Sequence, residues 1–79
     1  MNPAIIKLLK ELKEETPEQT DIKTLSLLIV ENTNISNRRG LHEFIGMLIM
    51  IGALVATPNK KVFTLNQDVI GRLIGESKA

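Results

Sequence analysis

The sequence predicts a single, mainly α-helical domain with one small β-hairpin, spanning residues 1–79. Two observations carry this prediction. Apolar residues recur at helical spacing in four segments, and each segment follows a residue type that commonly caps helices. Between the third and fourth segments, a β-forming run at residues 62–65 follows a turn at residues 58–61. The length suits one small domain of marginal stability, with a core of Ile, Leu and Val.

The first helix is predicted over residues 3–15. Asn2 can cap it, and Pro3 fits the first helical position, where the missing N–H costs nothing. The helix should end before Pro17, because the residue that precedes a proline disfavours helical geometry.

The second helix is predicted over residues 17–32, with Thr16 and Gln19 as a capping box. A start at Thr20 or Asp21 is an alternative. Its apolar stripe is wide, which is typical of a helix covered on two sides. The stripe comprises Ile22, Leu25, Leu27, Leu28, Ile29 and Val30.

The third helix is predicted over residues 37–52, with Ser36 as its preferred cap and Asn34 as a competitor. One face is apolar, and His42 lies at its boundary. That face comprises Leu41, Phe44, Ile45, Leu48 and Ile51, and the outward face comprises Arg39, Gly40, Glu43, Gly46, Met47 and Met50.

A hairpin over residues 54–65 follows, with Phe63 and Leu65 on the face toward the core. The last helix is predicted over residues 67–75, with Asn66 as its cap.

The composition argues against an enzyme. One His, no Cys and three Ser give no nucleophile–base pair at a suggestive spacing. No group of His, Asp and Glu has the spacing of metal ligands, so neither a metal nor a cofactor is expected. The N-terminus lacks a secretory signal, and the uncharged run 44–56 is shorter than the roughly 20 residues that span a bilayer. We therefore expect a cytoplasmic protein that does not enter the membrane.

Positive charge is concentrated in the second part of the chain. Residues 1–33 carry four basic and six acidic side chains, a net charge of −2. Residues 34–79 carry six basic and three acidic side chains, a net charge of +3. This asymmetry is compatible with ordinary surface charge or with a surface that faces a polyanion.

Residues 3–65 resemble winged helix-turn-helix domains. The resemblance rests on three helices followed by a hairpin, on the junction Leu-Ile-x-x-Gly-x-Leu-Val at residues 48–55, and on the basic turn before a Phe-Thr-Leu strand. It implies that the third helix lies in the major groove of DNA and that the hairpin contacts the backbone or the minor groove. Residues 66–77 resemble the additional C-terminal helix through which many members dimerise.

Carried over by position, the resemblance gives a DNA-binding surface at two places. The start of the third helix and the tip of the hairpin would contribute Ser36, Asn37, Arg38, Arg39, Lys60 and Lys61. The expected function is therefore that of a small DNA-binding protein, a regulator of transcription or replication that acts on double-stranded DNA.

The alternative is an adaptor that binds a protein partner. The outward face of the third helix is poor in hydrogen-bonding side chains, and Gly46, Met47 and Met50 would suit an irregular protein surface.

A homodimer is also expected, because a cysteine-free chain of this size has a small core. The last helix would pair with its mate through Ile70 and Leu73. Folding of that helix back onto the first helix, which would leave a monomer, is the competing explanation.

Overall fold

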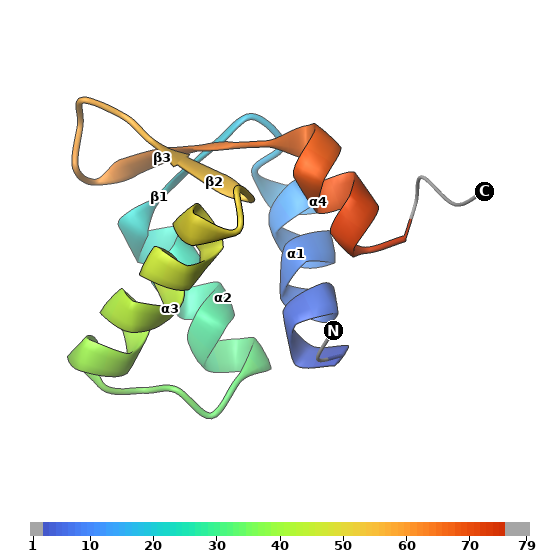
Figure 1. Cartoon of the computed structure of the whole chain (residues 1–79). Helices are drawn as coiled ribbons and strands as arrows, with labels where there is room; N and C mark the ends of the chain where they lie inside the picture. The colour runs from blue at the N-terminus through green and yellow to red at the C-terminus, as the bar shows by residue number, and fades with distance from the viewer. Residues whose placement is uncertain (1–2, 76–79) are drawn as a thin grey trace.

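The computed structural model describes residues 3–75 and contains four helices and a three-stranded antiparallel sheet (Figure 1). The predicted cap Asn2 lies outside the described residues. In chain order the elements are α1 (Pro3–Glu15), β1 (Gln19–Asp21), α2 (Ile22–Asn32), α3 (Arg38–Met50), β2 (Leu54–Ala56), β3 (Val62–Leu65) and α4 (Gln67–Leu73). The prediction of a mainly helical chain with a small β-hairpin is confirmed, and strand β1 extends the hairpin to a three-stranded sheet.

Helix α1 follows its apolar spacing. Leu8, Leu9 and Leu12 are fully buried, and α1 packs against α2 and α4. At its end, the backbone N–H and the hydroxyl of Thr16 both donate to the carbonyl of Leu12, at 2.9 and 3.0 Å. Pro17 then prevents the helix from continuing.

The predicted start of the second helix at residue 17 is wrong. Residues 19–21 form strand β1, which pairs with β3 so that Thr20 lies opposite Phe63. Helix α2 begins only at Ile22, one residue after the later of the two alternative starts, with Asp21 as its cap. The Asp21 carboxylate accepts a hydrogen bond from the backbone N–H of Thr24 at 2.8 Å. Hydrogen bonding by Thr24, through its side chain first and then its backbone, lowers the pKa of Asp21.

The strand displaces the predicted capping box because β3 offers an unpaired edge. Two backbone bonds frame the pairing, from Leu65 N–H to the carbonyl of Glu18 at 2.9 Å and from Ile22 N–H to the carbonyl of Lys61 at 2.8 Å. A strand of three residues is too short to show the alternation of apolar and polar residues from which a strand is predicted.

Thr20 provides a test of this pairing. Its side chain is buried beside Phe63, and its hydroxyl has no hydrogen-bond partner among the described residues. Valine has the same shape without the unsatisfied hydroxyl, so Thr20→Val should raise the free energy of unfolding by about 1 kcal/mol in urea denaturation.

Thr64→Val is the matched control, because Thr64 is only partly buried and its hydroxyl lies 3.5 Å from the side-chain nitrogen of Gln19. This control should stay within about 0.5 kcal/mol of the wild type. A Thr20→Val protein less stable than the wild type would contradict the buried placement of β1.

The prediction that the whole apolar stripe of α2 is covered by other elements is also wrong. Leu25, Leu28 and Ile29 are buried, but Leu27 is 59% exposed and Val30 is exposed as well. Helix α2 packs against α1 and adjoins β1, which leaves its outer side toward solvent.

Helix α3 begins at Arg38, and its cap is Asn37 in place of the predicted Ser36. The side-chain oxygen of Asn37 accepts the backbone N–H of Gly40 at 2.6 Å. The helix ends at Met50, two residues earlier than predicted, since Gly52 adopts φ +87°. The N–H groups of Gly52 and Ala53 donate to the carbonyls of Ile49 and Leu48, the two bonds of a Schellman motif.

The sheet closes the end of the helical bundle, with β3 between β1 and β2 (Figure 1). Phe63 and Leu65 lie on the buried face of β3, as predicted. The core joins the sheet to all four helices. It comprises Leu8, Leu9, Leu12, Leu25, Leu28, Ile29, Ile45, Leu48, Ala53, Leu54, Phe63, Leu65 and Ile70.

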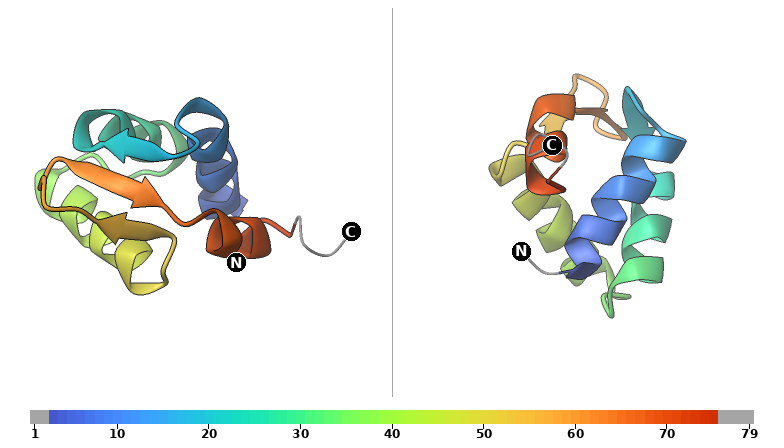
Figure 2. Two further views of the ribbon diagram at one scale, coloured as in Figure 1. Left: turned by 90° about the horizontal axis from the view of Figure 1, so that it is seen from above. Right: turned by 90° about the vertical axis from the view of Figure 1, so that its right-hand side faces the viewer.

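Helix α4 lies beside α1 (Figure 2). Asn66 caps it by accepting the N–H of Val69 at 3.3 Å, and the side-chain amide of Gln67 donates to the carbonyl of Pro17. Ile70 is fully buried within the chain, and Leu73 packs partly against the core. The expectation that Ile70 is available to a second copy is therefore corrected: the helix folds back onto its own domain.

Candidate nucleic-acid interface

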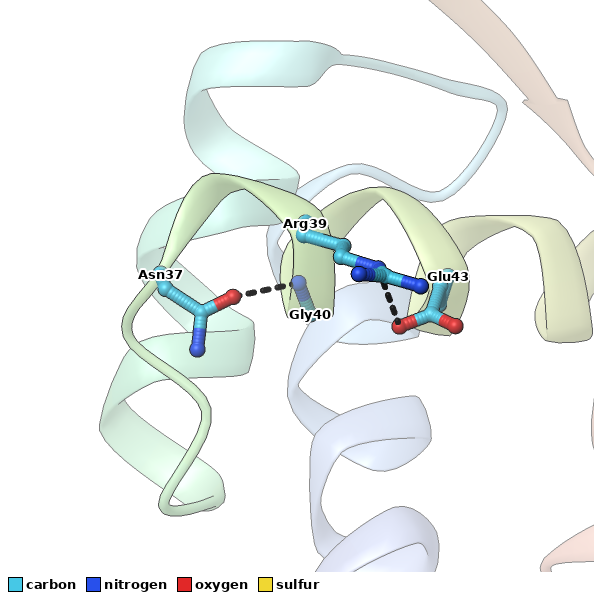
Figure 3. Close-up of polar contacts among 4 residues, drawn as sticks. All are labelled: Asn37, Arg39, Gly40 and Glu43. Carbon is cyan, nitrogen blue, oxygen red and sulfur yellow. Dashed lines mark hydrogen bonds and ion pairs between the residues drawn. The ribbon is translucent and has the colours of Figure 1, made fainter.

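The first turn of α3 presents two guanidinium groups to solvent. Arg38 and Arg39 are both exposed. Arg39 forms an ion pair with Glu43 across one helical turn, with Nε 3.9 Å from the carboxylate oxygen (Figure 3). Their side chains are 88% and 70% exposed, so this pair contributes little to stability and leaves the guanidinium open to another anion.

Ser36 and Asn37 precede this turn and are exposed. Asn37 has a structural role as the cap of α3, since its side-chain oxygen points at the N–H of Gly40 (Figure 3). Ser36 has no such role among the hydrogen bonds of the described residues. The structure therefore brings all four predicted residues of the helix start together on the surface.

The hairpin tip carries the second basic pair. Lys60 and Lys61 are exposed at the turn between β2 and β3. The Thr57 hydroxyl lies 2.8 Å from the carbonyl oxygen of Asn59 and 2.9 Å from that of Val62, and the Asn59 side chain accepts the N–H of Lys61 at 2.9 Å. These bonds fix the shape of the turn, so both lysines extend from an ordered support.

A groove of about 300 Å³ separates α3 from the hairpin. Its walls are His42, Gly46 and Ile49 on α3, and Ala56 and Lys60 on the hairpin. The complete lining is Ile22, His42, Ile45, Gly46, Ile49, Ala56, Thr57, Asn59, Lys60 and Phe63.

His42 connects the two basic pairs. It lines this groove with Lys60, and it also lines the adjoining depression between α2 and α3 with Arg38 and Ser36. From the sequence, His42 is expected only at the boundary of the apolar face of α3. Because His42 follows Arg38 by four residues, the two side chains lie on the same face of a helix, and this spacing could have indicated from sequence that His42 belongs to the same surface.

The two exposed-face glycines of α3 have different reasons to be glycine. A Cβ on Gly40 would lie 2.8 Å from Cγ2 of Ile35, so the close approach of the preceding loop requires glycine there. A Cβ on Gly46 would meet no atom within 4 Å. A glycine inside a helix costs about 1 kcal/mol relative to alanine, and nothing within the described residues requires that cost at Gly46.

The far end of α3 is apolar and exposed. Met50 is 86% exposed, and Ile49, Ile51 and Val55 are exposed beside it in the chain or on β2. Met47, which the sequence placed on this face, is partly buried and packs against the core. Of the three predicted protein-interface positions on α3, Gly46 and Met50 remain on the surface.

Residues 3–75 contain no cluster of three or more His, Cys, Asp or Glu that could hold a metal ion. Within the same residues, every helix is too short or too polar to cross a bilayer. Comparison with protein-family models, with curated proteins and with solved structures finds no match to this chain. The arrangement of four helices and a three-stranded antiparallel sheet is compatible with a winged-helix domain, and a function has to be argued from the surface itself.

Proposed function

We propose that this protein is a winged-helix DNA-binding protein, a regulator of transcription or replication. The start of α3 would lie in the major groove, and the β2–β3 turn would contact the phosphate backbone. The observation that carries the proposal is a pair of depressions along α3 that share His42 in their lining, one with Arg38 and the other with Lys60 of the facing hairpin.

The charges of this surface favour a polyanionic partner. Arg38 and Arg39 stand at the positive end of the α3 dipole, where cations are disfavoured and an incoming phosphate would relieve the repulsion. Lys60 and Lys61 extend from the ordered turn without an acidic side chain within three residues of them in the sequence. Four phosphate contacts from these side chains would supply most of a non-specific affinity for DNA.

The first half of α3 would contribute to sequence preference. An arginine can donate two hydrogen bonds to the O6 and N7 atoms of guanine, and Ser36 or Asn37 can bond a phosphate or a base. Arg39 is the better candidate for a base contact, because it lies nearer the centre of the exposed face than Arg38 does.

Titration against random duplex DNA at several salt concentrations tests this proposal. If the four basic residues each neutralise one phosphate, the slope of log K against log [salt] should be near −3.6 per protomer, at about −0.9 per contact. Lys60→Ala/Lys61→Ala should flatten the slope by roughly 2 and weaken all sequences alike. If Arg39 reads a base at a specific site, Arg39→Ala should also reduce sequence preference by about 1–3 kcal/mol.

Lys7→Ala/Lys10→Ala is the matched control, because these lysines are equally exposed but lie on α1. This variant removes the same charge and should leave the slope unchanged. Absence of binding at low salt, or binding that none of the four basic residues affects, would refute the proposal.

A second candidate function is supported by the exposed apolar end of α3. Met50, Ile51 and Val55 form a surface that a protein partner could cover, with Gly46 allowing close approach. As an adaptor of this kind, the wild type would not bind duplex DNA at low salt. Met50→Asp would then abolish binding to the protein partner without changing the fold.

We also propose that the protein acts as a homodimer, since two symmetric helix–hairpin units would match a palindromic site. Of the two residues predicted for the contact, only Leu73 has surface to offer, because Ile70 is fully buried within one chain.

A further inference from the structure

Gly46 lies in the middle of the exposed face of α3, where no close contact within the described residues requires a glycine. Apart from its chain neighbours and the backbone of α3, no atom lies within 4 Å of the position that its Cβ would take, whereas a Cβ on Gly40 would lie 2.8 Å from Cγ2 of Ile35. A helix that carries an avoidable glycine on its exposed face can bring its backbone unusually close to a partner. Gly46 also forms the wall of the groove opposite Lys60, on the side of α3 that faces the hairpin.

The Glu43 carboxylate is exposed one turn before Gly46, and beyond Glu43 the surface of α3 is apolar. Residues 44–50 of α3 carry no charged side chain, and Ile49 is exposed one turn further along the groove. The polar edge of a base would lose its hydrogen bonds to water on contact with this surface, and the surface offers no hydrogen-bonding group to replace them. In the major groove, the apolar feature of a base pair is the C5-methyl group of thymine.

We infer that Gly46 and Ile49 receive a thymine methyl group, so that the second half of α3 selects an A·T pair. The inference rests on the proposed DNA-binding function and names a sequence preference for it. Seven residues separate Arg39 from Gly46, which is about 10 Å along the helix axis, or about three base pairs if α3 follows the groove. The preferred site therefore has a guanine contacted by Arg39 and a thymine about three base pairs away.

Selection from a pool of random duplexes, followed by removal of one methyl group, tests this inference. The wild type should enrich sites with a thymine at a fixed position relative to a guanine. Replacing that thymine by deoxyuridine removes only its methyl group, and Kd should rise about four-fold, the change expected for one methyl-sized group transferred to water.

Gly46→Ala provides the protein side of the same experiment. The added Cβ should hold the helix away from the base pair and raise Kd for the thymine duplex about ten-fold. The midpoint of urea unfolding should rise at the same time, because alanine favours the helix. The variant should bind the thymine and deoxyuridine duplexes equally, whereas deoxyuridine at a thymine outside the fixed position should not affect either protein.

The outcomes separate this inference from the proposed function. A wild type that binds DNA but shows no fixed thymine, or no penalty for deoxyuridine, overturns the inference and leaves DNA binding standing. The same holds if Gly46→Ala binds as tightly as the wild type. A wild type that binds no duplex DNA at low salt overturns both.

Discussion

Phe63→Ala should lower the free energy of unfolding by about 3–5 kcal/mol, measured by urea denaturation. Phe63 is 7% exposed, and its backbone pairs with Thr20 on one side and Ala56 on the other. Its ring forms part of the floor between the hairpin and α3, so truncation leaves a cavity that strands on both sides restrain from collapsing. At about 0.05–0.15 kcal/mol per residue, a domain of this length has roughly 4–12 kcal/mol in total, so this loss can unfold it.

Val55→Ala is the control for the Phe63 experiment, because Val55 lies in the adjoining strand β2 with about half of its side chain exposed. It should change the stability by less than about 0.5 kcal/mol. If Phe63→Ala cost less than about 1 kcal/mol, the hairpin would not be docked on the helices. That result would contradict the groove between α3 and the hairpin, and with it the proposed DNA-binding surface.

Ile70→Glu should abolish folding, as judged by circular dichroism and by sedimentation. Ile70 is 0% exposed within one chain, and burial of an unpaired carboxylate costs several kcal/mol. Arg72→Ala, at an exposed position of the same helix, should leave both the helical signal and the stability unchanged. A folded Ile70→Glu protein would contradict the packing of α4 against α1.

Leu73→Glu tests whether α4 also forms a dimer contact. Leu73 is partly exposed, so this variant should remain helical. If the wild type sediments as a dimer at micromolar concentration through α4, Leu73→Glu should sediment as a folded monomer. A monomeric wild type would refute the homodimer, and a Leu73→Glu dimer would place the contact on another surface.

The elements that local signals specify were predictable. Helix α1 has the apolar spacing and the two flanking prolines that define its ends, and its range of 3–15 coincides with the prediction. The cap Asn66 and the buried alternation of Phe63 and Leu65 likewise depend on neighbours within a few residues. In each case the physical cause acts over one turn of helix or one strand.

Strand β1 depends on pairing with residues 41 to 45 positions further along the chain, and it was not predicted from the sequence. Thr16 and Gln19 have the residue types and spacing of a capping box, but the box does not form, because Thr20 pairs with Phe63 and Gln19 lies in β1. The same dependence explains Leu27, whose apolar side chain extends the helical pattern of α2 although no element covers it.

Some residues of the candidate site could be identified from the sequence, and others only from the tertiary structure. Its basic residues were identified from sequence, because charge at a helix start and at a turn is visible without a fold. The role of His42 between them required the hairpin to lie against α3, and the difference between Gly40 and Gly46 required knowledge of what surrounds each.

The sequence by itself determined that four helices and a hairpin form and in which order, since capping, periodicity and turn chemistry act between near neighbours. Only the tertiary structure decided which apolar side chains are covered, because burial depends on elements that meet across the chain. Ile70 illustrates the difference. Its helical spacing showed that it lies on the apolar face of α4, but not which surface covers that face. In the structure, α4 packs on α1 and Ile70 is buried within the same chain.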